Sequence, residues 1–279
     1  MKIYHTRSGL LLEEQGQYYL HEAEWDEFIN DDELGQKCAR LCQELKPVEN
    51  GEDLLGEQLL APIGHQEVWA SGVTYYQSKI GREEEAKAAG GSDFYARVYL
   101  ADRPELFFKA TAARVSGPGD PIRIRKDSTW DVPEPELTLV VTSNAKIVGY
   151  TIGNDMSSRS IEGENPLYLP QAKTYDASAA LGPCILVSEA PLPDSTGIHL
   201  EIKRQRELVF TGQTDLSQLK RKPDDLVEYL CRETSFPYGV FLMTGTGIVP
   251  GSDFTLQPGD EVTIAIDGIG SLTNTVEKR

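Results

Sequence analysis

The sequence predicts an α+β fold that is mainly β, with a small N-terminal module followed by a larger and mostly antiparallel β body. Short runs with strict alternation, or rich in β-branched residues, recur along most of the 279 residues. Segments with helical periodicity are few, and no fixed-period repeat is present. We place the boundary at residue 64, which gives an α+β module at 1–64 and a body at 65–279.

The N-terminal module is expected to contain a β-meander and one helix. Residues 1–22 read as three short strands, MKIYHTR, GLLLEEQ and QYYLHE, separated by Ser-Gly and Gly-Gln turns. Apolar residues at helical spacing follow at Leu34, Cys38, Leu41 and Leu45. They predict a helix that ends before Pro47. The turn-rich stretch 48–65 is then the joint to the body.

The body reads as a succession of strands interrupted late by one helix. The strand-like runs after EVWASG are RVYL, ELFFKAT, LTLVV, KIVGYTIG, CILVS, IHLEIK, ELVF, VFLMT, EVTIAI and LTNTV. Pro223 and two following acids predict the start of the helix. Residues 78–96 break the β pattern, and their acidic run suits an exposed helix, while Gly90 and Gly91 also allow a mobile lid.

Composition excludes several classes of partner. A net charge of −17 and a pI near 4.7 oppose binding to nucleic acid or to anionic membrane surfaces. No apolar run approaches the roughly 18 residues that a membrane span needs, so a cytoplasmic protein is expected. Four scattered cysteines do not form a disulfide framework, and Cys38 and Cys42 are expected as small buried residues on one helix face.

Two glutamates lie at the start of an apolar run in WDVPEPELTLVV. Glu134 and Glu136 project from the same face of an extended segment, because side chains alternate with a period of two. Pro133 and Pro135 cannot donate to a β-ladder, which favours a strand edge or the rim of a sheet. Taken alone, the pair could be an ordinary exposed edge.

A third acid changes this interpretation. A turn at Ser143 and Asn144 allows LTLVV and KIVGYTIG to form a hairpin, which returns Asp155 to the start of the first strand, near Glu134 and Glu136. Packed carboxylates must be protonated, neutralised by cations or bound to a metal. Oxygen ligands favour Mg²⁺, Mn²⁺ or Ca²⁺, and three protein ligands leave positions for substrate, which indicates an enzyme.

Four ordered motifs, PEPEL, GYTIGNDMSSRS, AKTYDASAALGP and FLMTGTGIVPG, resemble those of the fumarylacetoacetate hydrolase superfamily over residues 65–279. SSRSIEGENPLYLPQAK and RPELFFKAT resemble its 2-keto-3-deoxy-D-arabinonate dehydratase branch most. The resemblance implies a mixed β-roll/sandwich and a Mg²⁺-dependent lyase that removes water from a 2-keto-3-deoxy sugar acid. It also implies a 2-oxo acid substrate and a homodimer or homotetramer. The residues it implies are Glu134, Glu136 and Asp155 for the metal, Glu105 and Lys173 for catalysis, and Ser78, Lys109 and Thr246 for substrate.

One departure from the superfamily pattern bears on the reaction. In GVTYYQSK, Thr74 replaces the Asn of a G-x-N-Y element, and Ser78 falls where hydrolases of the superfamily carry a water-activating His. The departure counts against hydrolysis but not against decarboxylation. The dehydration implied by the resemblance is the expected reaction, and an acylpyruvate hydrolase or decarboxylase using the same metal is the alternative. A non-catalytic metal scaffold is a third reading. Lys173 could also form a Schiff base or a plain ion pair.

Overall fold

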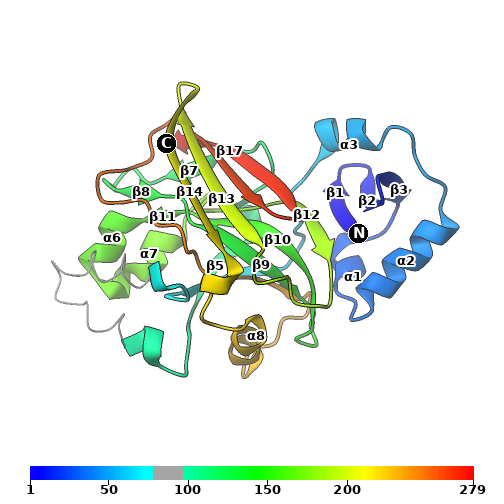
Figure 1. Ribbon diagram of the computed structural model, residues 1–279, viewed down its shortest axis with the longest axis horizontal. Coiled ribbons are helices and arrows are strands. Elements are labelled where there is room, and N and C mark those ends of the chain that lie inside the picture. Colours follow the sequence, from blue (N-terminus) through cyan, green and yellow to red (C-terminus); the bar gives the residue numbers. More distant parts are fainter. Residues whose placement is uncertain (78–96) are drawn as a thin grey trace.

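The structure is a computed structural model that describes residues 1–77 and 97–279. In this part of the chain two β-sheets pack face to face, and the N-terminal helices α1 (Trp25–Ile29) and α2 (Leu34–Glu44) lie at one end of the molecule (Figure 1). The predicted mainly β, α+β fold of the roll/sandwich type is confirmed.

The described residues form a large sheet of ten strands and a smaller sheet of five. In hydrogen-bonded order, the large sheet contains β3 (Gln17–His21), β2 (Gly9–Glu14), β1 (Lys2–Thr6), β12 (Ala179–Val187), β10 (Ile147–Asp155), β9 (Pro135–Val141), β15 (Val240–Met243), β4 (Glu67–Gly72) and β5 (Glu105–Thr111), with β6 (Val115–Ser116) beside β12. The five-stranded sheet contains β14 (Glu207–Asp215), β13 (Gly197–Arg204), β16 (Glu261–Ile266), β17 (Gly270–Lys278) and β7 (Ile122–Ile124). β8 (Asp131–Val132) pairs with β11 (Ser157–Ser158).

Most of these pairs are antiparallel, as the sequence predicts, because hairpins connect neighbouring strands. In the described residues the parallel pairs are β15 with β4, β12 with β6, and β17 with β7. The predicted meander is confirmed by the pairing of β1 with β2 and of β2 with β3.

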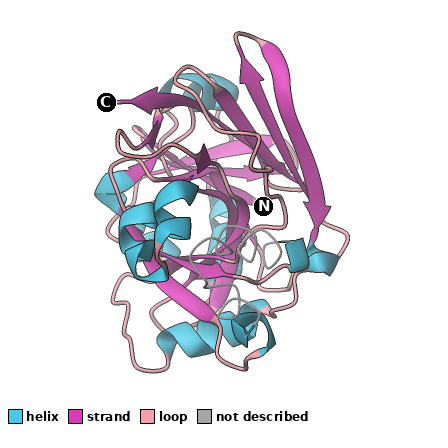
Figure 2. Ribbon diagram, turned by 90° about the vertical axis from the view of Figure 1, so that its left-hand side faces the viewer, coloured by secondary structure: helices cyan, strands magenta, loops and turns pink. Residues whose placement is uncertain are grey.

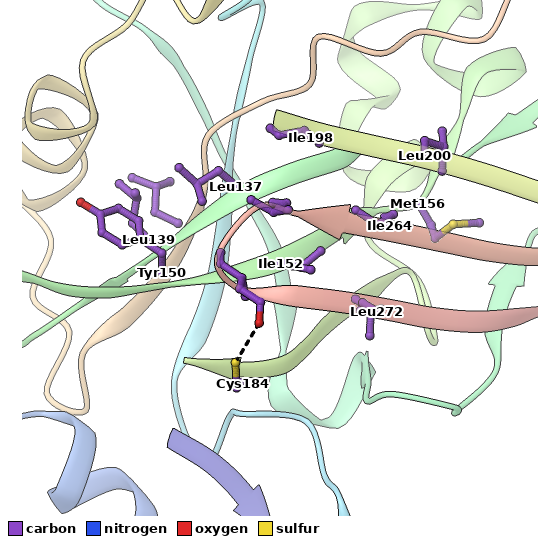
Figure 3. Close-up of a cluster of buried hydrophobic side chains, with 14 of the residues drawn as sticks. Leu137, Leu139, Tyr150, Ile152, Met156, Cys184, Ile198, Leu200, Ile264 and Leu272 are labelled. Carbon is purple, nitrogen blue, oxygen red and sulfur yellow. Dashed lines mark hydrogen bonds between the residues drawn. The ribbon is translucent and has the colours of Figure 1, made fainter. Parts of the chain in front are cut away.

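The two sheets enclose the main hydrophobic core. Alternate residues of β9 and β10, including Leu137, Leu139 and Ile152, face alternate residues of β13 and β16, including Leu200 and Ile264 (Figure 3). Period-two alternation places these side chains on one face. Burial between two sheets therefore fixes the register of β9 and β10, because a one-residue slip would expose every one of them.

The opposite face of the large sheet packs on the N-terminal helices. Val140, Phe241 and Ile185 form a second buried cluster with Phe28 of α1 and Leu34 of α2. The central strands of the large sheet are thus covered on both faces, which explains why β9 is buried along its whole length.

Other helices connect the strands. They are α3 (Gly51–Gln58), α6 (Arg159–Glu164), α7 (Leu169–Lys173) and α8 (Pro223–Cys231), together with the 3₁₀ turns Ala112–Arg114, Pro166–Tyr168 and Leu216–Gln218. The predicted helices at α2 and α8 are confirmed, and Cys38 and Cys42 are buried free thiols on α2. No helix of the described residues combines the length and apolar character that spanning a bilayer requires.

Two local predictions are wrong. RVYL, predicted as a strand, is helical at residues 97–100, and the stretch 48–65, predicted as turns, contains α3. Both are short segments whose conformation depends on what they pack against. The boundary at residue 64 stays a prediction, and β1 hydrogen-bonds directly to β12 of the body. The proposed helix or lid at 78–96 lies outside the described residues.

The inter-sheet core predicts a large difference between two leucines. Leu200 is fully buried on β13, whereas Leu208 on β14 is 55% exposed. We expect Leu200→Ala to lower the free energy of unfolding by about 2–5 kcal/mol, because it leaves a cavity, and Leu208→Ala to change it by about 0.5 kcal/mol or less. Urea denaturation of both variants measures this. Equal losses would contradict the core assignment.

Candidate active site

Three buried carboxylates meet where β9 begins and β10 ends. Glu134 immediately precedes β9, Glu136 is its second residue, and Asp155 is the last residue of β10. The antiparallel ladder pairs Gly153 with Glu136, and the Asp155 N–H donates to the Glu134 carbonyl at 3.0 Å. One oxygen from each carboxylate lies within 4.8 Å of the others. The predicted hairpin is therefore confirmed, and it brings the three acids together.

The prolines that flank Glu134 occupy the rim of the sheet. β9 lies between β10 and β15, so it is a central strand, and Pro135 is its first residue. A strand can begin with proline there because no ladder donor is needed at that position. The alternative of an exposed edge is excluded, since residues Glu134 and Glu136 are only 5% and 1% exposed.

Lys173 lies against two of the three acids. Its Nζ donates to Glu134 Oε2 at 2.8 Å, to Asp155 Oδ2 at 2.9 Å and to Ser157 Oγ at 2.6 Å. The ammonium is fully buried, so these three acceptors replace its hydration. Its Nζ also lies 5.7 Å from the centre of the Phe107 ring.

Two helical segments deliver Lys173 to this position. The Asn165 side chain accepts a hydrogen bond from the Leu167 N–H and caps the 3₁₀ turn that Pro166 begins, and α7 follows directly. Lys173 is the last residue of α7. Both α6 and α7 lie on the side of the molecule that Figure 2 presents to the viewer, next to the strand ends. The ENPLYLPQAK motif is thus a helical connection that places the lysine over the acids.

Two further cations complete the cluster. Lys109 Nζ pairs with Asp155 Oδ1 at 2.6 Å, and Arg159 Nη2 pairs with Glu134 Oε1 at 2.7 Å. Arg159 also reaches Glu162 at 3.4 Å. Burial is the main cause that lowers the pKa of Lys109, and Asp155 opposes that shift.

Glu136 differs from the other two acids. Its Oε2 accepts the Gly245 N–H at 2.6 Å, and it makes no ion pair with any described residue. Burial, and then repulsion from Asp155 and Glu134, raises the pKa of Glu136 well above its ordinary value. A proton on Glu136 therefore relieves the like-charge repulsion when no metal is present.

The acid cluster could hold a divalent ion. Among the described residues, ion pairs join Glu134, Asp155 and Glu162 to Lys109, Lys173 and Arg159, and Glu136 adds a fourth carboxylate. The all-oxygen donor set suits Mg²⁺, and Mn²⁺ or Ca²⁺ are compatible with it.

Glu105 lies at the end of the neighbouring strand. It is the first residue of β5 and pairs with Gly72, where an added Cβ would lie 2.3 Å from Glu105 Oε2. The carboxylate therefore packs directly over the glycine backbone. Glu105 shares a face of β5 with Phe107, whose ring contacts Lys173. This arrangement puts the acid on the same side of the sheet as the lysine.

The remaining predicted residues have different positions. Thr246 is buried beside Gly245. Its hydroxyl accepts a hydrogen bond from the Ile248 N–H at 3.1 Å and donates one to the Ile248 carbonyl at 3.2 Å. Ser78 lies outside the described residues. Substrate contacts by Ser78, Lys109 and Thr246 stay predictions.

Sequence reasoning did not single out Ser157, Arg159, Glu162 or Gly245. Ser157 and Arg159 follow Asp155 by two and four residues, so their position in DMSSRS was the available signal. Nothing in the sequence alone shows that the backbone N–H of Gly245 reaches Glu136, because the two are 109 residues apart.

Comparison with known proteins shows the family of the chain. The fumarylacetoacetate (FAA) hydrolase C-terminal family matches residues 76–277. A probable 2-keto-3-deoxyxylonate dehydratase of Haloferax volcanii is 50% identical over 77% of this chain and 73% of its own. A 2-dehydro-3-deoxy-D-arabinonate dehydratase of Saccharolobus solfataricus is 45% identical over 80% of this chain and 75% of its own.

A solved structure is similar over nearly the whole length of both chains. It is a 2-keto-3-deoxy-D-arabinonate dehydratase complexed with magnesium and 2,5-dioxopentanoate. The TM-score is 0.85 and the identity is 35%, and the match covers 100% of this chain and 99% of the other. On these matches, the chain belongs to the fumarylacetoacetate hydrolase family.

Proposed function

We propose that this protein is a Mg²⁺-dependent dehydratase that converts 2-keto-3-deoxy-D-arabinonate to 2,5-dioxopentanoate and water. The observation that carries the proposal is the buried acid triad with Lys173 in contact with two of its members. Its support is the similarity of the whole chain to a dehydratase whose structure holds magnesium and 2,5-dioxopentanoate.

The two relatives named for different sugar acids are compatible with one substrate. D-Arabinonate and D-xylonate differ only at C2 and C3. Oxidation to a ketone at C2 and loss of the hydroxyl at C3 remove both stereocentres. The 2-keto-3-deoxy acids of the two D-sugars are therefore the same compound, with one stereocentre at C4. Both names are consistent with the proposed substrate.

In this proposal Glu134, Glu136 and Asp155 hold the metal. A bound divalent ion supplies Lewis-acid stabilisation of the negative charge that develops on a 2-oxo acid when a C3 proton leaves. Glu105 removes that proton and returns one to the C4 hydroxyl, which departs as water. A proton then moves from C5 to C3, and the resulting C5 enol becomes the aldehyde. The atoms balance, because the net loss is one water.

Lys173 is proposed as a proton donor and electrostatic partner for the 2-oxo oxygen. Three acceptors surround its Nζ, an environment that favours the charged ammonium. An ammonium is not a nucleophile, so this geometry favours proton chemistry over a Schiff base. Borohydride reduction in the presence of substrate separates the two, because only a Schiff base leaves a stable adduct on Lys173.

We also propose that the enzyme is cytoplasmic and assembles as a homodimer or homotetramer. β14 is an outer strand of the described five-stranded sheet, and its Leu208 and Val209 are 55% and 40% exposed. An open strand edge with apolar side chains is a surface suited to pairing with another chain.

The direct test is turnover of a substrate panel. The purified protein with Mg²⁺ is incubated with 2-keto-3-deoxy sugar acids and with acylpyruvates, and products are identified by mass. We expect loss of one water from the C5 acid alone, and no turnover by Lys173→Met. Cleavage of a substrate into two fragments would support the hydrolase, and loss of carbon dioxide would support the decarboxylase. If no substrate in the panel changed in mass, the non-catalytic scaffold would be supported.

Removing one acid should weaken metal binding. We expect Glu136→Gln to lower the affinity for Mg²⁺ or Mn²⁺ by about 100-fold or more, because a neutral amide replaces an anionic ligand. Titration calorimetry with the metal alone measures this without reference to activity. Glu201→Gln, at an exposed position of β13, is the matched control and should bind as the wild type does. Unchanged binding by Glu136→Gln would reject the site.

The raised pKa of Glu136 predicts how pH affects stability. Between about pH 4.3 and the raised pKa of Glu136, the folded chain binds more protons than the unfolded chain. The free energy of unfolding therefore falls as pH rises through this window. Stabilisation by Mg²⁺ should grow over the same window, because a protonated carboxyl cannot bind the ion. Thermal unfolding in EDTA and in Mg²⁺ measures both trends. The prediction would be contradicted if the difference in thermal midpoint between wild type and Glu136→Gln stayed constant with pH.

A further inference from the structure

Lys109 has a set of contacts that does not suit a substrate ligand. Its Nζ is fully buried, donates to the carbonyls of Met156 at 2.9 Å and of Lys173, and pairs with Asp155 Oδ1 at 2.6 Å. The two carbonyls accept hydrogen bonds, and Asp155 Oδ1 is a close ion-pair contact without hydrogen-bond geometry. Three protein oxygens already surround the ammonium, so a substrate oxygen would have to compete with them for the remaining proton.

A bulge in β5 aims the side chain at these acceptors. Val68 of β4 pairs with Ala110, but the next residue, Trp69, pairs with Phe108, so Lys109 is the extra residue on β5. A β-bulge re-aims a side chain and interrupts the ladder at that point. The local backbone of β5 is therefore adapted to the position of this lysine.

The acceptors belong to the two segments that hold Lys173. The carbonyl of Lys173 lies at the C-terminal end of α7, where a cation favourably meets unpaired helix carbonyls. Met156 lies between Asp155 and Ser157, and both of these accept hydrogen bonds from Lys173 Nζ. One ammonium thus joins β5 to the backbone of Lys173 and to the segment that receives its side chain.

We propose that Lys109 is a positioning residue, which fixes the distance between the Lys173 ammonium and the acid triad and does not bind substrate. This inference rests on the proposed dehydration for its effect on turnover. It replaces the expectation that Lys109 is a substrate ligand.

A second link between α7 and β5 gives an independent way to perturb the same geometry. The Thr174 hydroxyl, one residue after Lys173, donates to the Phe108 carbonyl at 3.2 Å. Loss of this bond should loosen the end of α7 without removing a buried charge. Thr174→Val is therefore a milder variant that tests the same idea.

The experiment compares Lys109→Met, Thr174→Val and the exposed control Lys126→Met. Hydrogen exchange of the α7 amides is measured without substrate, and kcat and KM are measured at saturating Mg²⁺, well below each thermal midpoint. We expect faster α7 exchange and a kcat about 100-fold lower in Lys109→Met, with a smaller loss in Thr174→Val. KM should stay within about threefold of wild type in both, and Lys126→Met should match wild type.

Three outcomes would overturn the proposal. A raised KM with unchanged α7 exchange would make Lys109 a substrate ligand. A lower thermal midpoint with unchanged kcat and KM per folded molecule would make it a structural residue only. If Lys109→Met does not fold, unchanged exchange and kcat in Thr174→Val would overturn the proposal instead. Failure of the wild type to turn over the sugar acid would reject the proposed function, and the exchange result would still report on positioning.

Discussion

The burial of like charges at the ends of β9 and β10 is the constraint on which the site depends. Glu134, Glu136 and Asp155 are almost inaccessible to water, and their oxygens lie within 4.8 Å of one another. Such a cluster is unfavourable unless cations or protons neutralise it. The buried lysines and Arg159 neutralise part of the negative charge, and the raised pKa of Glu136 favours a proton on the third acid. A divalent ion held by the three acids would meet the same requirement.

The double burial of the central strands keeps this cluster in place. The five-stranded sheet covers one face of β9, and α1 and α2 cover the other. Neither a register slip nor a rotation of β9 is possible without exposing apolar side chains. The acids lie at the end of this packed segment, so the packing of the core sets their spacing. A rigid scaffold of this kind supplies the preorganisation that electrostatic catalysis needs.

The parts of the site that could be predicted are those formed by residues close together in the sequence. The convergence of Glu134, Glu136 and Asp155 followed from a period of two and one hairpin, both of which are visible in the sequence. The contacts of Lys109 were not predictable, because they depend on a bulge opposite Val68 and on the end of α7. The N–H of Gly245 reaches Glu136 only through the pairing of β15 with β9. Residues 97–100 and α3 show the same limit, because tertiary packing decides the conformation of short segments.

Thr74 connects the departure from the hydrolase pattern to the acid triad. The Thr74 hydroxyl donates to the Thr244 carbonyl at 2.7 Å. A Cβ at Gly245 would lie 2.0 Å from the oxygen of this hydroxyl. Gly245 also has φ +92°, which favours glycine. The residue that replaces the Asn of the hydrolases therefore supports the turn whose N–H holds Glu136. A change at Thr74 would therefore act on Glu136 through this turn, so the threonine contributes to the packing that supports the acid triad.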